Sequence, residues 1–187
     1  MNRDYFNLFF AVFPNRDVAQ KIEALAVDLR KAHGLKGEPL PAHRLHVSLV
    51  GLGSGYSALP AEIVEKACLA GDQLSSPPFQ AAFSRTESFD RKSEKDHPFV
   101  LSGSDGLDAL RSFRATLHEA VKRAGLGRLA GRSGFTPHVT LLYADRLLSE
   151  EYPVSPPVSW TVEEFALVWS HVGKKRYKRL GEWRLKS

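Results

Sequence analysis

Two short segments of this sequence place a histidine two residues before a hydroxyl side chain. Residues 46–49 are His-Val-Ser-Leu, and residues 138–141 are His-Val-Thr-Leu. Alternate residues of a β-strand share a face, so the two aliphatic side chains of each segment are expected to point into the core. His46 with Ser48, and His138 with Thr140, would then share the opposite face. Each strand should therefore present an imidazole beside a hydroxyl.

A pair of imidazoles suits the cleavage of a phosphodiester. Because histidine titrates at a pH of about 6.5, one ring can accept a proton while the other donates one. The hydroxyls of Ser48 and Thr140 can bind the non-bridging phosphate oxygens and stabilise the charge of the transition state. This chemistry needs no metal and no cofactor. We predict that His46 and His138 are catalytic and that the two hydroxyls bind phosphate.

The elements around the two motifs occur in the same order twice. Each motif follows one or more strands and an amphipathic helix, in which apolar residues recur at steps of three and four. The expected strands are residues 5–13, 45–52, 79–89, 98–102, 138–143, 158–169 and 176–185, and the expected helices are residues 18–32, 59–74 and 107–121. Asn15 and Ser57 are candidate caps of the first two helices.

This repetition predicts an α+β fold with two lobes related by a pseudo-twofold axis. Each lobe would hold a mostly antiparallel sheet. The sequence contains no segment with the composition of a linker, so residues 1–187 are expected to form a single bilobal domain.

The composition is compatible with a nucleic-acid ligand. The net charge is +5 and the isoelectric point is about 9.4. Near the C-terminus five cations surround one aromatic residue, Tyr177; they are Lys174, Lys175, Arg176, Lys178 and Arg179. This run could hold an RNA backbone or be a solvated hairpin tip, and we predict that it lies close to the motif histidines.

The sequence also suggests where the protein acts. The single cysteine, Cys68, cannot form an internal disulfide, and the apolar run Leu8–Phe13 is too short to cross a membrane. A cytoplasmic monomer without a membrane partner is expected.

The two motifs and their surroundings resemble those of the 2H phosphoesterase superfamily, specifically the bacterial and archaeal RNA 2',3'-cyclic phosphodiesterases long called 2'-5' RNA ligases. Besides residues 46–49, the segments Leu8–Val12, Thr136–Leu142, Phe165–Leu167, Arg176–Tyr177 and Trp183–Leu185 are similar to family patterns. The resemblance implies two sheets that flank a central cleft, with helices on the outside.

The resemblance also implies a mechanism for RNA ends or small cyclic nucleotides. His46 would be the proton donor and His138 the proton acceptor. Water activated by His138 would attack the cyclic phosphate, and His46 would protonate the departing 3'-oxygen, which leaves a 2'-phosphate. The reverse reaction with a 5'-hydroxyl would make a 2'-5' linkage.

Two positions depart from the family pattern. Ser48 stands where threonine is usual, which keeps the hydroxyl. Tyr143 stands where bacterial relatives commonly have an arginine, so Arg44, Arg132 or Arg176 would have to supply the phosphate-binding cation. Because neighbouring strand residues alternate, either Phe9 or Phe10 should face the cleft, and Phe9 is the candidate for stacking on a base. Lys174, Arg176, Tyr177 and Tyr143 complete the candidate contacts with substrate.

Other interpretations of these residues remain open. The spacing of His43 and His46 could suggest a metal site, but no acidic or cysteine cluster accompanies it, and His43 is expected in a loop. His33, His97, His118 and His171 are interpreted as ordinary surface or helix-end residues. The motifs fit equally an enzyme for another small cyclic or 2'-5' linked nucleotide. A non-catalytic module that binds RNA ends would need cations and aromatic residues rather than paired imidazoles.

Overall fold

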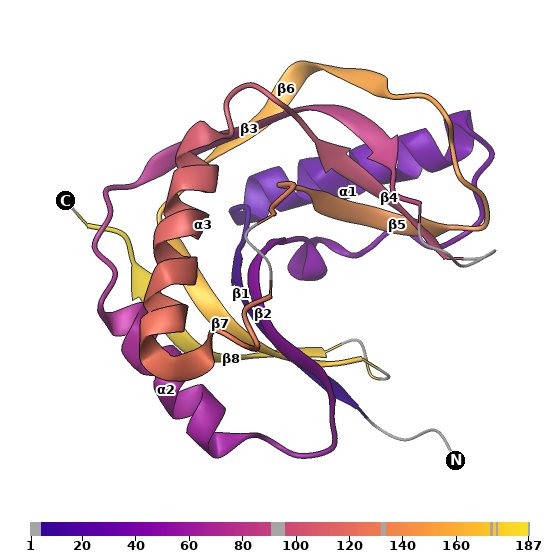
Figure 1. The fold of residues 1–187 in the computed structure, drawn as a ribbon. Helices are drawn as coiled ribbons and strands as arrows, with labels where there is room; N and C mark the ends of the chain where they lie inside the picture. Colours follow the sequence, from indigo (N-terminus) through magenta and orange to yellow (C-terminus); the bar gives the residue numbers. More distant parts are fainter. Residues whose placement is uncertain (1–4, 91–95, 132–133, 173, 175, 187) are drawn as a thin grey trace.

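The computed structural model describes residues 5–90, 96–131, 134–172, 174 and 176–186 (Figure 1). The strands are β1 (Phe6–Val12), β2 (Val47–Tyr56), β3 (Phe79–Ser88), β4 (His97–Ser102), β5 (Val139–Ala144), β6 (Tyr152–Val162), β7 (Glu164–His171) and β8 (Arg176–Arg184). The helices are α1 (Arg16–Ala32), α2 (Ala61–Asp72) and α3 (Asp108–Val121), with a short 3₁₀ helix η1 (Ala42–Arg44) and a π-helical turn η2 (Lys122–Leu126). None of the described helices is long and apolar enough to cross a membrane.

The strands form two antiparallel sheets of four strands each. Their orders are β2-β1-β7-β8 and β5-β4-β3-β6, and every neighbouring pair is antiparallel. The strands that follow the two motif histidines, β2 and β5, are both edge strands. The expected α+β architecture with an antiparallel sheet in each lobe is confirmed.

Helices α1 and α3 each contact the sheet of the other lobe. The unit β1-α1-β2 belongs to the first sheet, yet α1 packs against β5 and β6 of the second. The corresponding unit β4-α3-β5 belongs to the second sheet, and α3 packs against β2 of the first as well as β3. Figure 1 shows α1 behind the second sheet and α3 beside the first. Each lobe is thus partly covered by a helix from the other.

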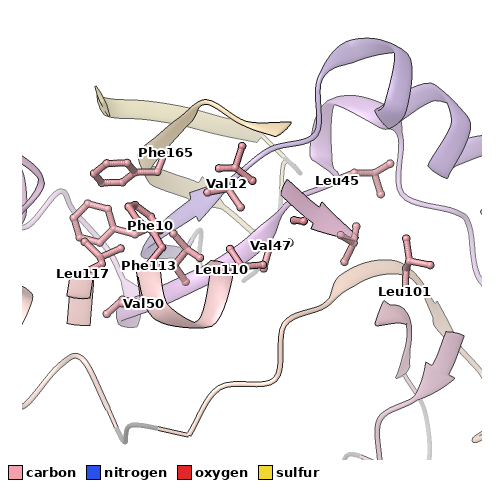
Figure 2. Packing of buried hydrophobic residues seen from close by; sticks show 14 of the residues in the cluster. Phe10, Val12, Leu45, Val47, Val50, Leu101, Leu110, Phe113, Leu117 and Phe165 are labelled. Atoms are coloured by element: carbon pink, nitrogen blue, oxygen red, sulfur yellow. The ribbon is translucent and has the colours of Figure 1, made fainter. Parts of the chain in front are cut away.

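The buried side chains from both sheets join in one large core cluster. In the first lobe Phe165 of β7 lies at the centre, with its ring 5.2 Å from that of Phe113 in α3 and 6.1 Å from that of Phe10 in β1. Figure 2 shows these three rings beside Val50 and Leu117. Aromatic pairs at this separation contribute packing beyond the area they bury, so the contact fixes α3 on the first sheet.

The connection from α1 to η1 lies directly against the edge of β5. The backbone N–H of Leu40 donates to the carbonyl of Leu141 over 2.7 Å. Gly37 has a φ of 112°, and a Cβ atom at this position would meet the carbonyl oxygen of Tyr143 at 2.1 Å. Only glycine fits both the conformation and the close approach. The first lobe is therefore joined to the second at the motif strand itself.

Several expectations about the elements need correction. The predicted strand 158–169 is two strands, since β6 pairs with β3 in one sheet and β7 pairs with β1 in the other. The chain changes sheet at Glu163, with strand-forming residues before Glu163 and after Glu164. Strand β6 also begins at Tyr152, earlier than expected. Its prolines are tolerated because β6 is an edge strand, where one side of the backbone makes no ladder hydrogen bonds.

The second helix also starts later than expected. Its N-cap residue is Pro60 and no side chain caps it, so the prediction of Ser57 as the cap is wrong. Asn15 does cap α1, with its Oδ1 accepting from the N–H of Val18 over 3.0 Å.

Two histidines interpreted as surface residues are buried instead. His97 is the first residue of β4 with 8% of its surface exposed, and His118 is 6% exposed in α3. The Nε2 atom of His118 lies 3.3 Å from the carbonyl oxygen of Gly131, a hydrogen bond that compensates its burial. His171 is the last residue of β7, and His33 follows the end of α1 as its C-cap, in agreement with its interpretation as a helix-end residue.

Candidate active site

The two motif histidines are held in the same way. The Nδ1 atom of His46 lies 2.7 Å from the carbonyl oxygen of Arg44, and the Nδ1 atom of His138 lies 2.8 Å from that of Thr136. A carbonyl can only accept, so in both rings Nδ1 carries the hydrogen and donates it. The Nε2 atom is then the basic nitrogen of each neutral ring. Each imidazole is oriented by the backbone two residues before it, immediately before an edge strand begins.

The hydroxyl of Ser48 is next to the basic nitrogen of His46. The Nε2 to Oγ distance is 3.1 Å, and because this nitrogen is unprotonated in the neutral ring, the hydroxyl donates. This contact is the one that strand alternation predicts. Thr140 occupies the equivalent position of β5 and is half-buried.

The surroundings of His46 favour its neutral form. Burial is the main cause that lowers the pKa of His46 from 6.5 to about 4, against the opposing effect of the hydrogen bond to Arg44. Repulsion from the charges of His138 and Arg44 lowers the pKa further. The contribution from His138 shows that the two motif histidines lie near enough to interact electrostatically. A bound anion would oppose the charge repulsion.

A cavity of about 540 Å³ lies beside His46 and Ser48. That volume is within the usual range for sites that hold a small molecule. Its walls include Phe9, Arg44, Tyr143 and Tyr177, four of the residues predicted to contact substrate. The cavity is bounded by β1, β2, β7 and β8 of the first lobe and by Tyr143 and residues 129–131 of the second.

Aromatic rings surround the imidazole of His46. The ring of Phe9 is roughly parallel to it at 5.3 Å, and the ring of Tyr177 is perpendicular to it at 5.4 Å. Phe10 points to the opposite side of β1 and is fully buried. The side of the sheet that carries the cavity is therefore the Phe9 side.

Among the described arginines predicted to supply the phosphate-binding cation, Arg44 lies in the cavity wall and Arg176 does not. Its guanidinium lies 5.4 Å from the centre of the Tyr177 ring. Burial raises the pKa of Tyr177, while the charge of Arg44 and a hydrogen bond from it act in the opposite direction. The Nε atom of Arg44 is buried and makes no hydrogen bond within the described part of the chain. A charged donor with unused hydrogen-bonding capacity next to His46 is suited to a phosphate oxygen.

The remaining predicted cations are less close to the cavity. Arg176 is the first residue of β8 and is exposed, and Lys174 is an exposed residue of the turn before it. Arg179 is turned the other way, 4.4 Å from the centre of the Phe13 ring and paired with Glu164 and Glu182. Of the described residues in the run 174–179, Tyr177 alone is among the cavity residues. Arg132 and Lys175 lie outside the described residues.

Sequence reasoning missed one buried cation close to both motifs. The Nε atom of Arg114 donates to the carbonyl of Leu49 over 3.2 Å, and the guanidinium lies 5.4 Å from the centre of the Phe135 ring. Arg114 thus connects α3 with a residue of the first motif and with the segment that leads to His138. The sequence feature that could have identified Arg114 is its position in the apolar stripe of α3, between Leu110 and Leu117.

No group of three or more His, Cys, Asp or Glu side chains that could hold a metal ion occurs among the described residues. His43 is exposed in η1 and lines a separate hollow with Phe13 and Arg16. The spacing of His43 and His46 therefore does not bring them together on one site.

The chain belongs to the 2'-5' RNA ligase superfamily, whose family model matches residues 14–174. It is 28% identical over 171 residues to the RNA 2',3'-cyclic phosphodiesterase of Thermus thermophilus, which covers 90% of this chain and 83% of that protein. The family recognised from the two motifs is confirmed, and so is the assignment of the chain to the phosphodiesterase enzymes.

Solved structures agree with this assignment. TT0787 of Thermus thermophilus has a TM-score of 0.73 and 28% identity, with 96% of this chain and 97% of that chain covered. E. coli LigT in complex with NADP+ has a TM-score of 0.73 and 25% identity, with 98% and 99% covered. The similarity extends over both lobes.

The low pKa of His46 should make stability depend on pH. The unfolded chain protonates this ring near pH 6.5, whereas the folded protein resists protonation down to about pH 4. Between these values the unfolded state binds more protons, so the free energy of unfolding should fall as the pH is lowered through this window. In His46→Asn the fall should be smaller. Urea unfolding at pH 6.5 and 4.5 measures both, and an equal fall in the two proteins would contradict the burial of a neutral His46.

Proposed function

We propose that this protein hydrolyses 2',3'-cyclic phosphate ends of RNA to 2'-phosphates without a metal ion. The observation that carries the proposal is the matched pair of imidazoles, each with Nδ1 bonded to the carbonyl two residues before it and each next to an edge strand. Two basic nitrogens held in equivalent ways are suited to one proton transfer each. The name of the Thermus thermophilus relative supports the choice of substrate.

The reaction assigns one proton transfer to each histidine. Nε2 of His138 accepts a proton from water, and the resulting hydroxide forms a bond to phosphorus. The bond between phosphorus and the 3'-oxygen breaks, and Nε2 of His46 gives its proton to that oxygen. The products are a 2'-phosphate and a 3'-hydroxyl. With a 5'-hydroxyl in place of water, the same groups would make a 2'-5' linkage: the hydroxyl gives its proton to His138 and bonds to phosphorus, and the 3'-oxygen leaves with the proton of His46.

His46 must gain a proton before it can act as the acid. In the free protein its pKa of about 4 leaves the ring neutral at pH 7. The negative charge of a bound phosphodiester offsets the charge of Arg44 and raises this pKa. Proton uptake by His46 therefore accompanies substrate binding, and Ser48 rotates its hydroxyl from the imidazole to a phosphate oxygen.

The first prediction concerns metal dependence. The purified protein should convert an RNA that ends in a 2',3'-cyclic phosphate at the same rate with and without excess EDTA, because the proposed proton transfers use imidazoles alone. Mass spectrometry and resistance or sensitivity to phosphatase identify the product. Loss of turnover in EDTA, restored by a divalent cation, would contradict the mechanism and point to a metal-activated water instead.

The second prediction separates the two histidines. His46→Ala and His138→Ala should each lower kcat by about a hundredfold to ten-thousandfold on a cyclic phosphate end. A nitrophenyl phosphodiester has a leaving oxygen that needs no protonation, so it should restore much of the activity lost in His46→Ala and little of that lost in His138→Ala. The opposite pattern would exchange the acid and base roles. Circular dichroism of both variants controls for folding.

The third prediction concerns the phosphate-binding cation. Arg44→Gln should weaken substrate binding by about tenfold to a hundredfold, the usual effect of losing a hydrogen bond to a charged group. Arg176→Gln removes the same charge from an exposed position and should change binding by less than about twofold. Fluorescence titration of an RNA with a 2'-phosphate end measures both. Equal losses would mean that general charge, rather than a contact by Arg44, holds the phosphate.

A further inference from the structure

A row of polar side chains on the cavity wall is not used by the proposed reaction. Strand register aligns Ser54 of β2 with Asn7 of β1, and Asn7 with Ser170 of β7. All three residues line the cavity. Residues directly opposite in an antiparallel sheet have Cβ atoms about 5 Å apart, so these side chains form one continuous polar strip.

Asn7 has a hydrogen-bonding capacity that the protein does not use. Its Oδ1 atom is buried and accepts no hydrogen bond within the described part of the chain. Buried polar atoms in folded proteins are nearly always paired, because an unpaired one destabilises the fold. The torsion that ends in the amide is soft, so the oxygen can turn toward a donor that enters the cavity.

The polar strip lies beyond Phe9, on the side away from His46. Phe9 follows Asn7 by two residues on the same face of β1, which places Asn7 about 7 Å further along the strand. The Phe9 ring lies 5.3 Å from the ring of His46. A nucleotide with its phosphate at His46 would bring its base over Phe9 and the far edge of the base to Asn7.

Gly51 leaves room for a flat ring beside Phe9. It is the cross-strand partner of Phe9, and a Cβ atom at this position would meet no atom within 4 Å. On the opposite side, Leu129 of the second lobe lines the same cavity with 38% of its surface exposed. The space between Phe9 and Leu129 thus has apolar walls and a polar end.

We infer that Phe9, Gly51 and the strip Ser54–Asn7–Ser170 form a nucleobase subsite. The base lies over Phe9 and Gly51, and Oδ1 of Asn7 accepts a hydrogen bond from an exocyclic amino group. Adenine and cytosine carry such a group where uracil carries a carbonyl oxygen, which cannot donate to Oδ1, so the subsite favours a terminal nucleotide with an amino group at this position. This inference rests on the proposed function for the position of the phosphate.

The test compares two substrates that differ in the base. Wild-type protein should have a higher kcat/KM for 2',3'-cyclic AMP than for 2',3'-cyclic UMP. In Asn7→Leu the value for 2',3'-cyclic AMP should fall about tenfold, equivalent to about 1.4 kcal/mol, while that for 2',3'-cyclic UMP changes by less than about twofold. Equal losses on both substrates, or no loss on either, would overturn the assignment of Asn7 to the base edge.

A second variant tests the space beside Phe9. A Cβ atom at Gly51 meets no atom within 4 Å, so Gly51→Val should fold normally, which circular dichroism checks, and should fill the subsite. It should weaken both cyclic nucleotides about tenfold or more but leave hydrolysis of methyl nitrophenyl phosphate, which has no base, unchanged. Gly134→Val is the matched control, because a Cβ there also meets no atom within 4 Å and Gly134 is not among the cavity residues. Unchanged nucleotide turnover in Gly51→Val would overturn the subsite.

Binding measurements distinguish failure of the subsite from failure of the proposed function. If wild-type protein hydrolyses no cyclic nucleotide, the proposed function fails, yet calorimetric titration with adenosine 2'-monophosphate and uridine 2'-monophosphate still tests the subsite. Asn7→Leu should weaken the adenosine compound alone. Identical affinities of the two compounds for wild type and variant would reject the subsite whatever the protein catalyses.

Discussion

The relative placement of the two motif histidines depends on how the edges of two separate sheets are held together. His46 and His138 each stand at the start of an edge strand, so neither sheet alone contains both. The backbone bond from Leu40 to Leu141 and the close approach of Gly37 to Tyr143 join the first lobe to the second motif strand. The crossing of α1 and α3 adds a shared core. Movement of one lobe against the other would break these contacts, and the distance between the imidazoles is thereby fixed.

Local patterns in the sequence were sufficient for much of this arrangement. Strand alternation correctly predicted that Ser48 lies beside His46 and that one of Phe9 and Phe10 faces the cavity, because backbone geometry fixes the side-chain period of a strand. The change of sheet at Glu163 was not predictable in this way. Strand-forming residues lie before Glu163 and after Glu164. Only their pairing with strands far away in the sequence shows that these residues belong to two different sheets.

The same limit explains the polar residues that were missed. Asn7 is an ordinary strand residue until β2 and β7 bring Ser54 and Ser170 alongside it. Arg114 belongs to a helical stripe of apolar residues, and its contacts with Leu49 and Phe135 come from distant segments. Long-range pairing decides which polar side chains share a surface, and periodicity within one element carries no information about it.

The electrostatics of the cavity are unbalanced in the free protein. Its described wall contains Arg44 and His46 but no carboxylate. Burial is the main cause of the low pKa of His46, and the positive charge that lowers this pKa further is also charge that attracts an anion. An anionic ligand would supply the missing charge and at the same time favour the protonated form of His46.

The joined edges of β2 and β5 also affect what can reach the backbone of these strands. An edge strand with unpaired carbonyls is a template on which another polypeptide can add a strand. Here the carbonyl of Leu141 is taken by the N–H of Leu40, and that of Leu49, at the bulge in β2, by the guanidinium of Arg114. At these two positions another polypeptide would meet side chains, and the main-chain carbonyls would already accept hydrogen bonds. A peptide laid along them would lack these two acceptors, which disfavours aggregation through these edges.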